Sequence, residues 1–250
     1  MTDGLGHHNF TVGNLAVELE AVDDPIRRGD QVCHFFCFVG RQVQYLHAAA
    51  GDFSRMVVPH LICVGHKDEA IAEARCAQTL DPVSLPAGTN LAVILSFAGH
   101  FTEAVEVSLK VLEVDPSFAR AYEDLGRAYE QLRMYSQAIA AFAKAVECSG
   151  RSSRDLASLA YSFAIAGKQK EALKLLQEIK GLSRKSYVSP FSFALVFTGL
   201  GNQREALAWL EKAYKACDGA IPFIRENPRL APLHSDSRFR DLVRRMNFPA

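Results

Sequence analysis

The strongest restriction on the fold of this 250-residue chain is a dipeptide that recurs every 34 residues. An acidic or amide residue is followed by alanine at Glu69-Ala70, Glu103-Ala104, Gln137-Ala138, Glu171-Ala172 and Glu205-Ala206. Four residues before each dipeptide stands a turn position, which is filled by Gly65, Gly99, Arg133, Gly167 and Gly201. Five hits in one register are hard to obtain by chance, so the sequence predicts an array of repeated units that stack on one another.

The residues inside each unit resemble the tetratricopeptide repeat (TPR) family, whose unit is a pair of antiparallel helices. The third unit, counted from Ala119, is the best match. Its first-helix positions are filled by Tyr122, Leu125, Gly126 and Tyr129, and its second-helix positions by Ala138, Phe142 and Ala145. The resemblance implies an all-α, right-handed TPR solenoid of about five helix-turn-helix repeats with a C-terminal capping helix.

Simple packing rules account for this pattern. Glycine and alanine at fixed positions let neighbouring helices approach closely, and large residues between them fill the remaining space. A glycine between the two helices suits the left-handed conformation that ends a helix. Asp81-Pro82 and Asp115-Pro116 end second helices, because a residue before proline avoids the α region.

The repeats are expected over residues 51–217. The five units are 51–84, 85–118, 119–152, 153–186 and 187–217. Residues 1–50 do not continue the period and receive no fold assignment. Pro59 falls in the middle of the first unit's first helix, so that helix should be shortened or kinked.

Residues 218–250 break the period and are expected to cap the last repeat. Residues 236–246 have helical spacing, with Asp236 near the start. This segment carries six arginines, Arg225, Arg229, Arg238, Arg240, Arg244 and Arg245. We interpret them as a solvated cap surface in preference to an anion or nucleic-acid site.

The C-terminal part of the chain resembles a narrower group within the TPR family. The run from Tyr187 to Pro190, the segment Ala208 to Tyr214 and the run Asn227 to Leu230 look like the ending of bacterial TPR proteins. Many of those proteins carry a winged-helix, cyclase or kinase effector domain before the repeats. The resemblance implies a bacterial, signalling-type setting.

Composition narrows the classes of partner. The formal net charge is zero, which gives no global electrostatic reason to expect nucleic acid or an anionic membrane. No apolar run approaches the roughly 20 residues that span a bilayer. The six cysteines are scattered, and residues 1–10 show no signal peptide, so we expect reduced thiols and a cytoplasmic location.

Candidate chemistry is sparse and lies near the N-terminus. Cys33 and Cys37, with Cys63 and His66, have spacings that a zinc site could use, but the phenylalanines around Cys37 favour buried cysteines. Cys63 near His66 is the one thiol with a neighbouring base, and nothing in the sequence supplies the rest of a catalytic site. We therefore predict no enzyme activity, no cofactor and no metal.

The concave face of the array is the better candidate site. In TPR arrays the outward positions of the first helices line a groove, and the resemblance places seven residues there. They are Asn90, Arg120, Glu123, Arg127, Glu130, Arg154 and Tyr161. Phe191 and Leu195 make the C-terminal end of this groove apolar. A peptide or partner helix with an acidic and an apolar part would fit, although Glu123, Arg127 and Glu130 could equally form ion pairs on a solvated helix.

These observations predict a protein-interaction scaffold that binds a peptide or partner protein in the concave groove. One alternative is a regulatory module of a bacterial signalling or transcription system acting in trans. Another is a metal- or thiol-dependent activity of the N-terminal segment, and self-association through the first repeat is also open. The chaperone-tail clamp of the family is not expected, because Asp124 stands where that clamp needs a basic residue.

Overall fold

The structure is a computed structural model that describes residues 61–62 and 66–246. Within these ranges the chain forms helices and turns, without a strand. The α-helices are α4 (Lys67–Leu80), α5 (Leu85–Ala98), α6 (Phe101–Val114), α7 (Ala119–Gln131), α8 (Tyr135–Cys148), α9 (Ser153–Ile165), α10 (Gln169–Leu182), α11 (Pro190–Gly199), α12 (Gln203–Lys215) and α13 (Ser237–Arg245). Two 3₁₀ helices, η2 (Ile221–Phe223) and η3 (Pro228–Leu233), precede α13.

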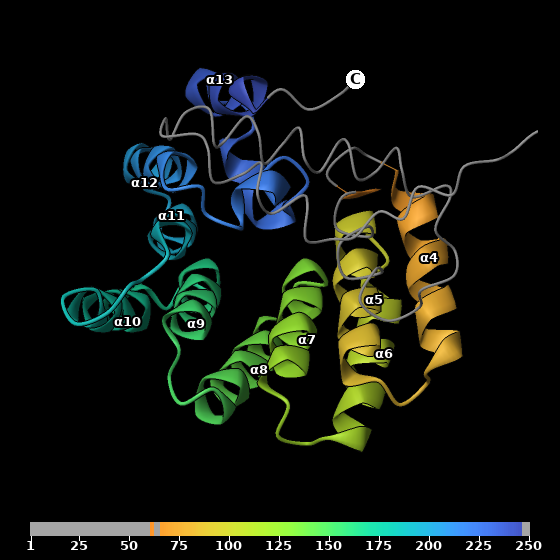
Figure 1. Cartoon of the computed structure of the whole chain (residues 1–250). Coiled ribbons are helices and arrows are strands. Elements are labelled where there is room, and N and C mark those ends of the chain that lie inside the picture. The colour runs from red at the N-terminus through yellow and green to blue at the C-terminus, as the bar shows by residue number, and fades with distance from the viewer. Residues whose placement is uncertain (1–60, 63–65, 247–250) are drawn as a thin grey trace, which may run out of the picture.

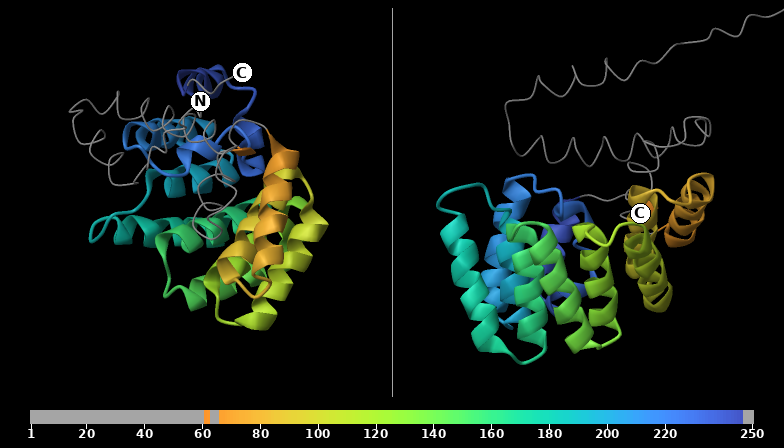
Figure 2. Two further views of the ribbon diagram at one scale, coloured as in Figure 1. Left: turned by 45° about the vertical axis from the view of Figure 1, so that its right-hand side comes forward. Right: turned by 90° about the horizontal axis from the view of Figure 1, so that it is seen from below.

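The helices form consecutive pairs that pack into a curved stack (Figure 1). The pairs α5–α6, α7–α8, α9–α10 and α11–α12 each contain two packed helices, and the first helix of one pair packs on the first helix of the next. Figure 2 shows the same stack in two further orientations. The all-helical TPR solenoid that the sequence predicts is therefore confirmed.

The turns inside the pairs depend on one backbone conformation. Gly99, Gly167 and Gly201 have φ of 94°, 79° and 72°, and each lies within two residues of the end of a first helix. Arg133 occupies the equivalent position with φ 59°, a conformation that is less favourable for a residue with a Cβ. A left-handed residue ends the first helix and lets the chain reverse into the second.

The core between the helices alternates small and large side chains. The alanines of the recurring dipeptides that lie in α6, α8, α10 and α12 are completely buried. Gly126 on α7 faces Phe142 on α8, and a Cβ added at Gly126 would lie 2.6–2.8 Å from the phenyl ring. The small residues therefore set the close approach of the helices, as the sequence pattern predicts.

The segment after α12 closes the end of the stack. Leu230, Leu233, Phe239 and Leu242 are buried and belong to one apolar cluster with Leu210 of α12. Asp236 is the N-cap of α13, and its side chain accepts a hydrogen bond from the backbone N–H of Arg238. The predicted C-terminal capping helix is thus confirmed.

The same segment also crosses the inner side of the curve. In Figure 1 its 3₁₀ helices lie between α11 and α5, above α7. The rings of Phe97 on α5 and Phe223 on η2 stack with centroids 5.8 Å apart. Glu226 forms an ion pair with Lys67 on α4, with Nζ and Oε2 2.9 Å apart. The C-terminal segment therefore spans the concave face from the last repeat back to the first described helices.

Several sequence predictions lie outside the described residues. They are the fold of residues 1–50, the kink at Pro59, the turn at Gly65 and the arrangement of Cys33, Cys37 and Cys63.

Candidate partner-binding groove

A pocket of about 450 Å³ lies on the concave face. The first helices α5, α7, α9 and α11 form its floor and sides, and residues 218–229 of the C-terminal segment form the opposite wall. The side chains at one end are apolar and include Ile94, Phe97, Leu195 and Phe223. Arginines gather at the other end. The groove that the sequence predicts is therefore partly enclosed by the chain itself.

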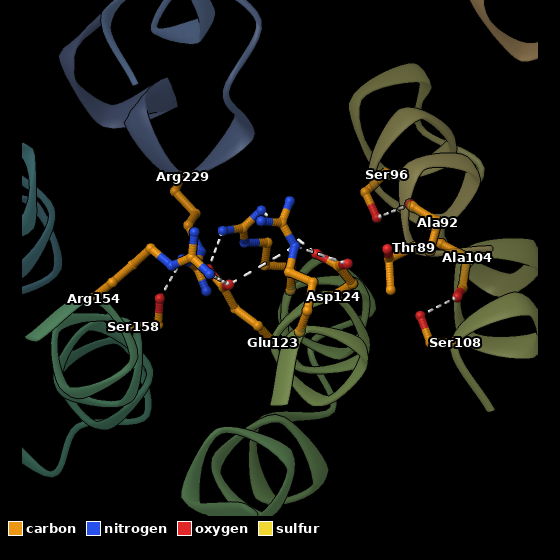
Figure 3. Close-up of polar contacts among 12 residues, drawn as sticks. Thr89, Ala92, Ser96, Ala104, Ser108, Glu123, Asp124, Arg154, Ser158 and Arg229 are labelled. Carbon is orange, nitrogen blue, oxygen red and sulfur yellow. Dashed lines mark hydrogen bonds and ion pairs between the residues drawn. The ribbon is translucent and has the colours of Figure 1, made fainter. Parts of the chain in front are cut away.

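The structure brings five of the seven predicted groove residues together at this pocket. These five are Asn90, Arg120, Glu123, Arg127 and Arg154. Figure 3 shows Glu123 on α7 close to Arg154 on α9 and to Arg229 from the C-terminal segment, with Asp124 on the side of α7 away from α9. The other two predicted residues, Glu130 and Tyr161, are buried beneath Arg229.

Glu123 is the centre of the arginine cluster. Its side chain is fully buried, and it forms ion pairs with Arg127 and with Arg154, the latter at 2.9 Å from Nη2 to Oε2. Arg120 lies further away, with Nε 3.9 Å from Oε2. Burial alone would raise the pKa of Glu123, but Arg127, Arg120 and Arg154 together lower it to about 2. Glu123 therefore stays ionised and holds three guanidinium groups at the pocket.

The pKa of Asp124, in contrast to that of Glu123, is raised. It is buried, and its Oδ2 accepts a hydrogen bond of 3.2 Å from Nε of Arg120. Burial raises the pKa of Asp124 to about 6, despite the nearby Arg120 and Arg127. Two adjacent carboxyl groups thus differ in protonation near pH 5, because Glu123 has more arginine neighbours.

Arg229 enters the array from the C-terminal segment and is almost completely buried. Its Nε donates a hydrogen bond of 2.6 Å to Glu130, and its Nη1 donates one of 3.2 Å to Ser158. Its guanidinium carbon lies 4.9 Å from the ring centroid of Phe142 and 5.2 Å from that of Tyr161. The Tyr161 hydroxyl in turn donates to the backbone carbonyl of Arg229 at 3.2 Å.

These contacts correct two sequence interpretations. Glu123 and Glu130 do not form ion pairs on a solvated helix, because both side chains are buried. Arg229 is not part of a solvated cap surface. The reason in each case is the C-terminal segment, which lies over the inner faces of α7 and α9.

Sequence reasoning missed Arg229 as a groove residue. Six arginines lie in the last 33 residues, and their local sequence does not distinguish one that turns inward from five that do not. The nearest signal is Asn227-Pro228, since the Asn227 side chain accepts from the Arg229 N–H and starts η3. That pattern predicts where η3 begins, but it does not predict which helices the segment packs against.

The comparisons with known proteins agree with this fold. The tetratricopeptide repeat family model matches residues 89–153, which cover α6, α7, α8 and most of α5. Residues 89–153 therefore carry tetratricopeptide repeats. No curated protein sequence matches it significantly.

Solved structures of other proteins resemble the array. MamA of Desulfovibrio magneticus RS-1, from residue 41 to its end, superposes with a TM-score of 0.52 and 19% identity over 67% of this chain and 100% of that one. A thermophilic TPR protein of Thermus thermophilus gives a TM-score of 0.54 and 21% identity over 70% of this chain and 95% of that one. Identities this low establish the shared fold alone.

Two further features bear on function. No group of three or more His, Cys, Asp or Glu side chains in the described part of the chain is arranged to hold a metal ion. None of the helices that the structure describes is long and apolar enough to cross a membrane.

Proposed function

We propose that this TPR protein is a scaffold that holds a peptide or partner protein in its concave groove, without catalysing a reaction. A TPR fold is typical of protein-interaction scaffolds, and the groove supplies the anchors that such contacts use. The observation that carries the proposal is the arginine cluster. The side chains of Arg120 and Arg154 are 34% and 58% exposed, while the carboxylates that hold them are fully buried.

The partner that suits this groove has an acidic part beside an apolar part. Arg120 and Arg154 offer charge-assisted hydrogen bonds to a carboxylate. Phe191 and Leu195 line the apolar end of the same groove. Glu130 and Tyr161 are excluded from the proposed contact, because Arg229 covers them.

Partner capture tests the proposal. The baits are the full chain, its Arg120→Gln/Arg154→Gln variant and a control, Arg204→Gln on α12, which does not line the groove. A bacterial lysate is the first source, since we propose a cytoplasmic, bacterial setting on the cysteine pattern and the resemblance of the chain's end. We expect at least one protein to be retained by the full chain and the control and lost by the double variant.

Crosslinking locates the contact. A photoreactive amino acid at Asn90, which lines the groove, should crosslink the captured protein, whereas one at Glu178 on the outside of α10 should not. Retention by all three baits, with crosslinks from Glu178 alone, would place the contact outside the groove and contradict the proposal.

Self-association belongs to the same proposal. Leu80 and Val83, at the end of α4 and just after it, are 66% and 68% exposed. Burying such side chains against a second copy would be favourable. Sedimentation velocity should show a mass that rises with concentration, and Leu80→Ser/Val83→Ser should shift the protein toward the monomer. A concentration-independent monomer would contradict self-association and leave the groove proposal intact.

A further inference from the structure

The C-terminal segment partly closes the concave pocket. The stack of Phe97 on Phe223, the Lys67–Glu226 ion pair and the Arg229–Glu130 ion pair hold the C-terminal segment over the face. The space left is about 450 Å³, which lies in the range of sites for small molecules.

The walls of the pocket divide into two chemical halves. Ile94, Phe97 and Phe223 line one half, together with Leu195 from α11. Ser96, which also borders it, donates its hydroxyl hydrogen to the carbonyl of Ala92, so this donor is already engaged. An apolar body in this half would be shielded from water on several sides.

Charged side chains line the other half. The charged residues that line the pocket are Arg120, Arg127, Arg154, Arg229, Glu123 and Asp218. Both acids are engaged, since Glu123 holds Arg127 and Arg154, and Asp218 accepts from the Ser189 hydroxyl and from the Ala220 N–H. The lining thus holds four arginines and two acids, while Asp124 and Glu130 pair with Arg120 and Arg229 from behind it.

Some of the guanidinium nitrogens at the pocket have no hydrogen-bond acceptor. Among the side-chain nitrogens of Arg120, only Nε has an ion pair or hydrogen bond within the described part of the chain. Nη2 of Arg229 is buried and has no hydrogen-bond partner there either, as is also true of Oε2 of Glu123 and Oδ1 of Asp124. Buried or half-buried guanidinium nitrogens without acceptors are costly, so an incoming anion would be stabilised.

We propose that this pocket binds a small molecule with an apolar body and a single carboxylate. The carboxylate lies against Arg120 and Arg154, and the body lies against Phe97, Leu195 and Phe223. This inference concerns the same face as the scaffold proposal but needs no protein partner. A bound carboxylate would compete with the acidic part of a partner for Arg120 and Arg154.

Isothermal titration calorimetry on the full chain tests the inference with three probes. Decanoate has both features, decanamide lacks the charge and butyrate lacks the apolar body. We expect decanoate, kept below its micelle concentration, to bind with one-to-one stoichiometry. Loss of a charge-assisted hydrogen bond weakens binding by about ten- to a hundredfold, so decanamide should bind more weakly by that factor. Equal binding of decanoate and decanamide, or no binding of decanoate, would overturn the inference.

Substitutions at the pocket test whether decanoate binds there. Arg120→Gln/Arg154→Gln should weaken decanoate binding by about ten- to a hundredfold and leave decanamide unchanged. Val93→Phe, which adds bulk at the pocket wall, should weaken both, whereas Arg204→Gln on α12 should affect neither. Undiminished decanoate binding by the double variant, with an unchanged circular dichroism melting curve, would overturn the inference. Because no partner protein is present, that failure would leave the scaffold proposal standing.

Discussion

Arg229 and Glu130 form a buried ion pair across 99 residues of sequence, with Nε and Oε2 2.6 Å apart. Glu130 also accepts a hydrogen bond from the Ser162 hydroxyl on α9. Burial raises the pKa of Glu130, and Arg229 opposes that rise. The pair fastens the C-terminal segment to the inner face of α7 and sets which part of the groove stays open.

Removing one partner of this pair should destabilise the protein strongly. Arg229→Ala leaves the carboxyl of Glu130 buried without its cation, which costs about 3–5 kcal/mol in the free energy of unfolding. Urea denaturation followed by circular dichroism measures the change. The exposed pair Arg151–Glu178 serves as the control, since Arg151→Ala should cost less than about 1 kcal/mol. Equal losses in the two variants would contradict the prediction.

Replacing both partners should restore much of the stability. Arg229→Met with Glu130→Leu leaves no buried charge, and apolar replacements of buried ion pairs are often neutral or stabilising by about 1–4 kcal/mol. The double variant should therefore be more stable than Arg229→Ala in the same urea experiment. A double variant that is less stable than the single one would show that the packing of Arg229 on Phe142 and Tyr161 matters more than the charge.

Two glycine substitutions should have opposite signs. Gly126→Ala places a Cβ within 2.6–2.8 Å of the Phe142 ring, so it should destabilise by about 1–3 kcal/mol through overpacking. Gly181, near the end of α10, has nothing within 4 Å of such a Cβ. Gly181→Ala should stabilise by about 0.4–1 kcal/mol, because alanine favours the helix. Thermal melts of both variants check the signs, and destabilisation by Gly181→Ala would contradict the open space there.

Asp124 should make the protein less stable as the pH rises from about 4 to about 6. Its pKa is about 6 in the folded protein against an ordinary value of 3.8, so in this window the folded form binds more protons than the unfolded one. The free energy of unfolding should fall by on the order of 2 kcal/mol across the window. Urea midpoints at a series of pH values measure the slope.

At lower pH, Glu123 should instead make the free energy of unfolding rise as the pH rises. Its pKa is about 2 in the fold against an ordinary value of 4.5, so its stabilisation is present above pH 4.5 and is lost as the pH falls toward 2. Asp124→Asn should flatten the decline between pH 4 and 6 while keeping the acid limb. An unchanged decline in Asp124→Asn would assign it to Glu130, whose pKa burial also raises.

Removing the C-terminal segment should unfold the last repeat. A chain ending at residue 218 loses Leu230, Leu233, Phe239 and Leu242, and it exposes Leu210 of α12, which they cover. Terminal repeats without a cap lose their stability and solubility. Hydrogen exchange should become fastest in α11 and α12. Slow exchange in α12 of the shortened chain would contradict the capping role.

The repeated unit and its fold follow from the amino-acid sequence alone. The helix pairs depend on contacts within about 34 residues, so alanines such as Ala138, the Gly126–Phe142 packing and the left-handed glycines reveal them directly. Even for Arg133, which lacks the usual glycine, the register alone predicts the turn that the structure shows. Local periodicity carries this information because each unit contacts only its neighbours.

Which side chains line the groove and which are covered, in contrast, depends on tertiary contacts. The sequence places Glu130 and Tyr161 on the concave face, but it does not show that Arg229 reaches them across 99 and 68 residues, respectively. No period links the C-terminal segment to the inner faces of α7 and α9, because the segment lies outside the repeat. Its position follows from burying Leu230 and Leu233 and from pairing Arg229 with Glu130, and contacts of that range have no local signature in the chain.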